Sequence, residues 1–158
     1  EADWVERAHD LIKRAEKKGV LVPLPLDVMV APAIDAPEQA VVKSREVVLA
    51  EEAIFDVGPE TQKTYAPLFR KAGTIVWNGP VGVFEQGAFS GGTKALALAI
   101  AESTAYSLAG GGDTLAALAA FGVRDRLSYV STGGGAFLEY LEGRPLPVVA
   151  ALKARGVL

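Results

Sequence analysis

The sequence predicts an α/β fold built around a parallel β-sheet, and three observations support that prediction. Short apolar runs alternate with helix-like segments, and the connections between them are short. Two of these runs, at 74–78 and 106–110, are almost wholly apolar, which is typical of strands covered on both faces. Three runs end in glycine-rich turns before a helix, at 78–85, 110–114 and 132–135. We therefore expect neighbouring parallel strands joined by right-handed crossovers.

The first 19 residues predict an amphipathic helix over 3–18. Apolar residues recur there at three- and four-residue spacing. Asp3 and Glu6 are spaced as a capping box, and Gly19 supplies a left-handed stop. His9 lies off the apolar stripe and is interpreted as a surface residue.

The next segment predicts strands. The run at 21–31 is apolar, but two prolines interrupt it or confine it to a sheet edge. Residues 32–42 are assigned to a loop, and further strands are expected at 45–50 and 53–57.

From Pro59 onwards, helices and strands alternate. Pro59 suits the first turn of a helix that ends before Gly73. Pro67 lies inside that helix, so a kink or two short helices, at 60–65 and 67–72, are expected. The elements that follow are strands at 74–78, 106–110 and 128–132, helices at 88–102, 114–122 and 136–143, and a proline-punctuated tail.

The composition indicates one soluble domain. Of 158 residues, 50% are hydrophobic, so one sizeable core is expected. The formal net charge of −3, with no basic block, argues against a nucleic-acid groove. No apolar run approaches the roughly 20 residues that span a bilayer. We interpret the chain as cytoplasmic, with no nucleic-acid or membrane partner.

Missing residue types and motifs exclude several kinds of site. The absence of cysteine excludes disulfides, thiolate metal sites and cysteine nucleophiles, and a single histidine excludes multi-histidine metal sites. The sequence contains no G-x-x-x-x-G-K-[ST], so it is not a P-loop protein. It also lacks G-x-G-x-x-G, the dinucleotide fingerprint.

The turn at 110–114 predicts a phosphate site. Three glycines, Gly111 and Gly112 among them, let a ligand approach the backbone, and Asp113 and Thr114 begin a helix whose amides attract anions. A carboxylate beside a phosphate needs a cation between them, so Asp113 is a candidate Mg²⁺ contact. The alternative is that Asp113 only caps the helix, and that Thr114 is an ordinary first-turn residue.

The turn at 132–135 repeats the glycines without an acid. Its amides fit an anion that carries no metal of its own, such as a phosphoryl group in transfer. The alternative is a tight glycine turn that serves close packing.

The turn at 78–85 carries two further candidates. Asn78 opens a sharp turn after a buried strand, and Gly82 permits a second close approach. Glu85 is placed to accept both hydroxyl groups of a ribose. The alternatives are that Asn78 only closes the turn and that Glu85 is a solvated surface charge.

Two other residues lie near such turns. Asp56 precedes a fourth strand-end turn; we favour a cap on the following helix over a contact with a nucleotide. Lys94 is interpreted as a surface residue. Because the three main turns contain no lysine, the fixed cations that phosphoryl transfer needs must come from elsewhere. If the three strands are parallel neighbours, the three turns line one crevice at a common edge.

Five strings in series resemble the phosphoglycerate kinase family: DVGPET, VWNGPVGVFE, LAGGGDT, VSTGGGAFLEYLEG and LP at 146–147. The match covers essentially the whole chain. It implies that residues 1–158 form the latter part of the family's C-terminal nucleotide-binding domain, including a tail at 145–158. The implied fold is a three-layer, Rossmann-like parallel sheet with helices on both faces, incomplete relative to the whole domain.

The resemblance also implies an activity, namely reversible phosphoryl transfer in glycolysis between 1,3-bisphosphoglycerate with MgADP and 3-phosphoglycerate with MgATP. Carried over position by position, the cofactor-binding residues are Glu85 for ribose, Asn78, Gly111, Gly112, Asp113 and Thr114 for phosphates, Asp113 for Mg²⁺, and Ile54 and Phe55 for adenine. Gly112 and Gly135 are the catalytic residues, because their amides face the transferring group.

Two parts of the family pattern are missing. They are the N-terminal domain with its arginine-rich phosphoglycerate site, and the first strands of the C-terminal domain with their phosphate-binding lysines. We therefore expect the chain to be inactive alone and its partners to be the nucleotide and these missing parts. The alternative is an autonomous, non-catalytic fragment that binds nucleotide weakly or not at all and self-associates through an exposed sheet edge.

Overall fold

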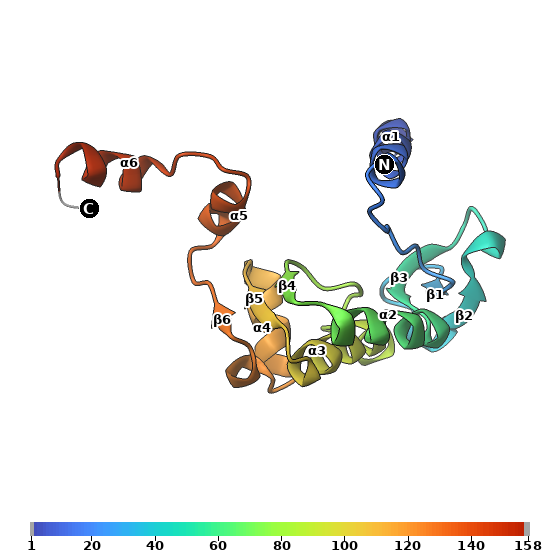
Figure 1. Cartoon of the computed structure of the whole chain (residues 1–158). Coiled ribbons are helices and arrows are strands. Elements are labelled where there is room, and N and C mark those ends of the chain that lie inside the picture. Colours follow the sequence, from blue (N-terminus) through green and yellow to red (C-terminus); the bar gives the residue numbers. More distant parts are fainter. Residues whose placement is uncertain (1, 157–158) are drawn as a thin grey trace.

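The computed structural model describes residues 2–156 and contains two three-stranded sheets, one antiparallel and one parallel (Figure 1). The strands are β1 (Asp27–Ala31), β2 (Val41–Ser44), β3 (Ala53–Val57), β4 (Thr74–Trp77), β5 (Tyr106–Ala109) and β6 (Tyr129–Val130). The α-helices are α1 (Val5–Lys17), α2 (Pro59–Lys71), α3 (Gly91–Glu102), α4 (Gly112–Ala120), α5 (Gly135–Leu141) and α6 (Pro147–Ala154). Figure 1 shows α1 and α6 projecting from the rest of the molecule.

The parallel sheet has the order β4-β5-β6, so the prediction of parallel neighbours is confirmed. The helices α3 and α4 cover one of its faces. Ile75, Trp77 and Ala109 point into that layer and pack against Ile100 and Leu118. This layer is the hydrophobic core of the molecule, and it fixes the carboxyl ends of the three strands at one edge.

The opposite face of the parallel sheet is open over most of its area. Val76, Tyr106 and Tyr129 remain 50%, 55% and 53% exposed. The helix α5 covers this face only near the carboxyl edge, where Phe137 is buried against Gly110. The α/β class is therefore confirmed, but within residues 2–156 the second helical layer is reduced to α5. The apolar sequence of these strands suits burial on both faces of the sheet, although one face is largely uncovered here.

The antiparallel sheet has the order β2-β1-β3, so β3 is not part of the parallel sheet. The strand expected at 45–50 is wrong: the strand ends at Ser44, whose side chain accepts a hydrogen bond from Glu46 N–H and starts a 3₁₀ turn at Arg45–Val47. The strand predicted from residue 21 begins only at Asp27, after the two prolines.

The helix α1 has no buried residue; Ile12 and Ala15 are half-buried, and its other residues are exposed. The capping-box prediction is wrong, because the N-cap residue is Trp4, in helical conformation and without a side-chain cap bond. Trp4 is 59% exposed. The stop at Gly19 is confirmed, with φ +66° and a hydrogen bond from Gly19 N–H to the Glu16 carbonyl.

The helix α2 runs unbroken through Pro67, so the prediction of two short helices is wrong. Pro67 deprives the Lys63 carbonyl of its donor. Both residues are exposed, which lets water satisfy that carbonyl. The helix is also held along its length by packing against α3.

Candidate functional site

The three glycine-rich turns lie at one edge of the molecule, the carboxyl edge of the parallel sheet. Gly79 N–H donates to Thr114 Oγ1 at 2.7 Å, which joins the first turn to the second. Ser131 N–H donates to the Ala109 carbonyl at 2.8 Å, which joins the strand before the third turn to the end of β5. The condition for a shared crevice at this edge is therefore met.

The amino end of α4 has free backbone donors. Its first intrahelical bond runs from Leu115 N–H to the Gly111 carbonyl, so the N–H groups of Gly112, Asp113 and Thr114 have no partner inside the helix. No side chain of the described residues caps it. Gly111 is the N-cap, so Asp113 lies in the first turn and does not cap; its side chain is exposed. Gly112 and Asp113 are exposed, so an anion can approach this helix start from their side.

Gly111 is required by its conformation and by its neighbour. Its φ is +98°, where side chains other than hydrogen are strained. A β-carbon there would also lie 2.8 Å from Asn78 Oδ1. The exposed Asn78 side chain therefore reaches the N-cap of α4.

Thr114 and Trp77 fix the first turn on α4. Thr114 is fully buried, and its Oγ1 is the acceptor for Gly79 N–H. The indole N–H of Trp77 donates to the Gly79 carbonyl at 2.8 Å. The hydroxyl oxygen of Thr114 therefore serves the turn, and the residue has no exposed surface in this structure.

Three hydrogen bonds hold the rest of the loop that carries Glu85. Thr93 Oγ1 accepts from Val81 N–H at 3.2 Å and from Gly82 N–H at 3.1 Å. Val83 N–H donates to the Phe55 carbonyl at 2.9 Å. This last bond brings Phe55, half-buried, and the exposed Glu85 onto neighbouring segments. The sequence analysis did not single out Thr93, although the sequence places this threonine three residues after Ser90, the N-cap of α3.

Asp56 caps a helix, but not the one predicted. Its Oδ2 accepts from Gly92 N–H at 2.7 Å, in the first turn of α3, and its Oδ1 accepts from Val57 N–H. A β-carbon on Gly82 or on Gly92 would overlap Asp56 Oδ1, so the close approach expected at Gly82 is to this carboxylate and not to a ligand. Burial raises the pKa of Asp56, and the two backbone hydrogen bonds oppose this only in part.

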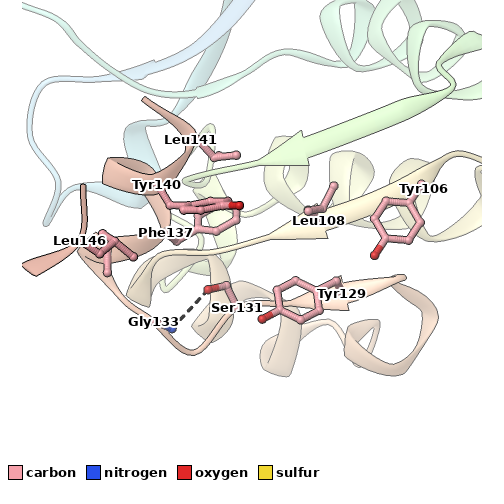
Figure 2. A pocket seen from close by; sticks show the side chains of 10 residues that line it. Tyr106, Leu108, Tyr129, Ser131, Gly133, Phe137, Tyr140, Leu141 and Leu146 are labelled. Carbon is pink, nitrogen blue, oxygen red and sulfur yellow. Dashed lines mark hydrogen bonds between the residues drawn. The ribbon is translucent and has the colours of Figure 1, made fainter. Parts of the chain in front are cut away.

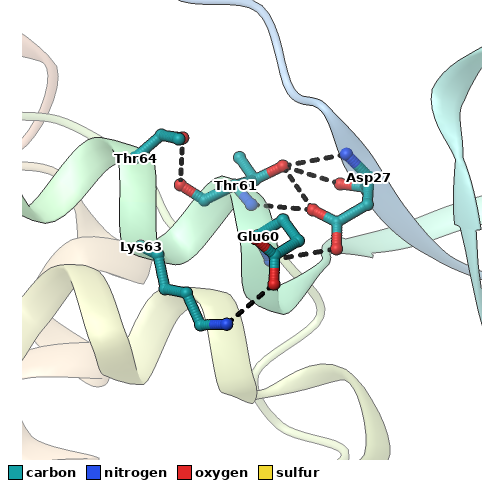
Figure 3. A network of polar contacts seen from close by, with 5 residues as sticks. All are labelled: Asp27, Glu60, Thr61, Lys63 and Thr64. Carbon is teal, nitrogen blue, oxygen red and sulfur yellow. Dashed lines mark hydrogen bonds and ion pairs between the residues drawn. The ribbon is translucent and has the colours of Figure 1, made fainter.

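The cap of α2 is Asp27, which sequence reasoning also missed (Figure 3). Its Oδ1 accepts from Thr61 N–H and from Thr61 Oγ1, both at 2.7 Å, and its Oδ2 accepts from Glu60 N–H at 3.0 Å. Burial alone would raise the pKa of Asp27, but the hydrogen bonds from Thr61 and Glu60 outweigh it and hold the pKa below the ordinary value. The string G-x-x-T at 58–61 marks this helix start in the sequence, but the acid that caps it, Asp27, lies 34 residues from Thr61.

The third turn leads directly into α5. Gly134 is the N-cap with φ +54°, and Gly133 N–H donates to Ser131 Oγ at 3.2 Å. Gly135 is exposed and is the first residue of the helix. The turn that contains it lies at the same edge as the other two turns because β6 pairs in parallel with β5.

A cavity of about 450 Å³ opens beside this turn, on the open face of the sheet (Figure 2). Its walls come from β5, β6, α5 and Leu146, and they are mainly aromatic and aliphatic. Of the three predicted phosphate-binding turns, only the third contributes to its lining, through Gly133. We therefore regard the cavity as uncovered sheet surface and look for the candidate phosphate site at the strand ends.

Asp113, the candidate Mg²⁺ ligand, does not belong to a cluster of acidic residues in the described part of the chain. Among residues 2–156, no three acidic, histidine or cysteine side chains gather in a group that could hold a metal ion. Within the same range, no helix has the length and apolar character needed to cross a membrane.

Comparison with known proteins identifies the family. The family model described as phosphoglycerate kinase matches residues 1–144. The chain is 56% identical over 155 residues to the phosphoglycerate kinase of Coxiella burnetii and 52% identical over 157 residues to that of Francisella tularensis subsp. holarctica. It covers 40% of each relative, while 98% and 99% of the chain are matched.

Solved structures agree. The phosphoglycerate kinase structure from Coxiella burnetii aligns with a TM-score of 0.90 over 96% of this chain and 39% of that one. The one from Pyrococcus horikoshii, at 31% identity, aligns with a TM-score of 0.83 over 99% of this chain and 38% of that one. Spanning about 40% of the length of the curated relatives it matches, the chain belongs to the phosphoglycerate kinase family.

Proposed function

We propose that this chain supplies the nucleotide-binding part of a phosphoglycerate kinase, which transfers a phosphoryl group reversibly between 1,3-bisphosphoglycerate with MgADP and 3-phosphoglycerate with MgATP. The observation that carries the proposal is the meeting of three glycine-rich turns at one sheet edge, around a helix start that no side chain of residues 2–156 caps. A polyphosphate is the ligand whose size and charge suit several weak amide donors on one rim.

The phosphates would bind at the start of α4. The amides of Gly111, Gly112 and Thr114 face an uncapped helix end, where about half a positive charge accumulates. Asn78, beside Gly111, adds a side-chain amide that can donate to a phosphate oxygen.

Asp113 fits the role of a Mg²⁺ ligand. Mg²⁺ in nucleotide sites is commonly held by one or two carboxylates together with substrate phosphates, so a lone exposed carboxylate beside the phosphate amides is a sufficient protein contribution. When bound, the ion would neutralise negative charge on the phosphates. Asp113 would hold it directly or through water.

The nucleoside would extend from the phosphates along the 78–85 loop. Glu85 would accept hydrogen bonds from the ribose hydroxyls, and Phe55, with Ile54 beside it, would border the adenine. Support for this direction comes from the hydrogen bond between Val83 N–H and the Phe55 carbonyl, which sets the two segments side by side.

Gly112 and Gly135 would present their amides to the phosphoryl group in transfer. Donors fixed where charge develops stabilise the transition state without reorganisation, and each is commonly worth about 3 kcal/mol. The strands β5 and β6 are parallel neighbours, so the turns that follow them, which contain Gly112 and Gly135, lie at one edge of the sheet. This arrangement supports a shared role for the two glycines.

The partners would be the parts of the relatives that this chain does not match. The open sheet face with its cavity is an apolar surface of the kind that such a segment covers, and the exposed edge of β4 is available for strand pairing. That segment would bring the lysines and the phosphoglycerate site, so the chain alone would be inactive. The protein would act in the cytoplasm.

Two experiments test the proposal. Calorimetry with MgADP on the chain itself should give heat that falls when EDTA removes the metal; silence at millimolar nucleotide would contradict nucleotide binding. Addition of the unmatched portion of the Coxiella burnetii kinase should then restore phosphoryl transfer, and continued inactivity of a folded mixture would favour the non-catalytic alternative. Sedimentation distinguishes that alternative further, because an uncovered sheet edge predicts self-association.

A further inference from the structure

Three helices begin in the same way. The third residue of α2, α3 and α4 is in each case a threonine with no exposed surface: Thr61, Thr93 and Thr114. Each hydroxyl oxygen accepts backbone N–H groups from a segment distant in sequence. Thr61 accepts from Leu26 and Asp27, and so ties the entry of β1 to α2.

The other two threonines hold one and the same loop. Thr114 accepts from Gly79 N–H at 2.7 Å, and Thr93 accepts from Val81 N–H and Gly82 N–H at 3.2 and 3.1 Å. The loop therefore runs from the amino end of α4 to the amino end of α3, and a buried hydroxyl fixes each end. Of these two hydroxyls, that of Thr93 is the one that accepts from two consecutive N–H groups.

The part of the loop fixed by Thr93 is the part that leads to Glu85. The next bond, from Val83 N–H to the Phe55 carbonyl, lies on the far side of Gly82. Gly82 is itself in contact with Asp56, whose carboxylate holds the first turn of α3. Thr93 and Asp56 thus act on the loop from the same helix start.

We infer that Thr93 is a positioning residue: its hydroxyl oxygen sets the spacing between the phosphate end of the nucleotide site at α4 and the ribose end at Glu85. The inference rests on the proposed function, and it assigns to Thr93 no contact with the ligand. Without the hydroxyl, two part-buried N–H groups would lose the acceptor that holds them against α3, and the loop would shift until other acceptors or water satisfied them.

The inference predicts a selective effect on binding. A nucleoside diphosphate must reach both ends of the site at once, whereas pyrophosphate needs only the α4 end. A shift of the loop therefore weakens binding of MgADP and leaves binding of magnesium pyrophosphate unchanged. General destabilisation of the fold would weaken both ligands alike.

The test is calorimetry of the chain with MgADP and with magnesium pyrophosphate, in the wild type, Thr93→Val and Thr93→Ser. For Thr93→Val we expect MgADP to bind about tenfold more weakly and pyrophosphate to bind with unchanged affinity. Tenfold is the scale of one lost hydrogen bond to a charged group, here the proposed bond between Glu85 and the ribose. Thr93→Ser keeps the hydroxyl and should restore the wild-type ratio of the two affinities.

Each other outcome decides a different point. An equal loss for both ligands, or no loss for MgADP, overturns the role of Thr93 while nucleotide binding stands. Failure of the wild type to bind either ligand overturns the proposed function, and this inference with it. If Thr93→Val does not fold, amide hydrogen exchange of the unliganded wild type decides: the amides of residues 81 and 82 should be protected, and exchange as fast as in open loops would overturn the inference.

Discussion

The helices α2 and α4 both begin after a glycine N-cap and both carry a buried threonine at their third position, but only in α2 do the first-turn amides donate to a carboxylate of the described chain. Asp27 fills that end with three hydrogen bonds. At α4 the equivalent space is open. The same local sequence therefore gives a capped helix start in one place and the proposed anion site in the other. The difference is whether a strand distant in sequence supplies an acid to cap the helix.

The helix α3 belongs with α2 in this comparison. Its first turn is also occupied by an internal carboxylate, that of Asp56. Among the three helix starts with a buried threonine, α4 alone leaves its amides to a ligand in the described part of the chain. This is the strongest physical reason to assign the phosphates to α4.

Removal of the internal cap should have the largest effect. Asp27→Ala leaves Glu60 N–H and Thr61 N–H without their acceptor, whereas Thr61 Oγ1 can still donate to the backbone carbonyl of residue 27. The free energy of unfolding should therefore fall by about 3 kcal/mol. Urea denaturation measures this loss. Lys63→Ala, which breaks only the exposed ion pair with Glu60, is the matched control and should not move the midpoint. Equal effects of the two variants would contradict the assignment of Asp27 as the cap.

The open helix start should respond in binding and not in stability. Asp113→Ala should weaken MgADP binding about ten- to a hundredfold, because a ligand of the metal is lost, and should leave binding in EDTA nearly unchanged. Calorimetry in both conditions gives the two affinities. A loss of equal size with and without Mg²⁺ would exclude the metal role.

Gly111→Ala tests the geometry that keeps α4 open. An alanine at φ +98° is strained, and its β-carbon would displace Asn78 Oδ1, so we expect a loss of about 1–2 kcal/mol in stability together with weaker MgADP binding. Gly112→Ala, whose β-carbon meets no neighbouring atom, is the control for stability. Wild-type stability in Gly111→Ala would show that neither constraint holds.

The two internal carboxylates should give opposite pH dependence. The pKa of Asp27 is lowered, so its contribution to stability is complete above about pH 3.9 and is lost as the pH falls through the folded-state value. The pKa of Asp56 is raised by burial, so its cost is absent at low pH and appears as the pH rises from about 3.9 through the folded-state value. A rise in pH from strongly acidic conditions therefore first strengthens the fold through Asp27 and then weakens it through Asp56.

Urea midpoints as a function of pH, measured for the wild type and the two asparagine variants, separate these contributions. Asp27→Asn should reduce the loss of stability in acid. Asp56→Asn should instead remove the fall of stability with pH above about 3.9, since the group that causes it is gone. Identical slopes in the three proteins would show that the environments of the two acids do not differ as described.

The sequence predicted the parallel sheet and the edge of the candidate site because both depend on local patterns. Each of these patterns can be recognised from a few consecutive residues: the apolar runs at 74–78 and 106–110, and the glycines at 110–112 and 133–135. Parallel pairing then carries separate turns to one rim without any further information.

The contacts that the sequence did not predict join residues far apart in the chain. Asp27 meets Thr61 across 34 residues, and Asp56 meets Gly92 across 36. Capping propensity predicts that an acidic side chain is favourable at a helix start, but it does not predict which strand supplies that side chain. The same limit explains β2: the valines at 41 and 42 look like loop residues until β1 is there to pair with them.

The two tryptophans of the chain sit at opposite extremes of solvent access. The indole of Trp77 is buried and bonded to the Gly79 carbonyl, within the rim where nucleotide would bind, whereas Trp4 lies exposed on α1. Intrinsic fluorescence therefore divides into a blue-shifted emission that follows the binding loop and a red-shifted emission that a collisional quencher such as iodide removes. Trp77 would therefore report on occupancy of the proposed nucleotide site, with no label needed.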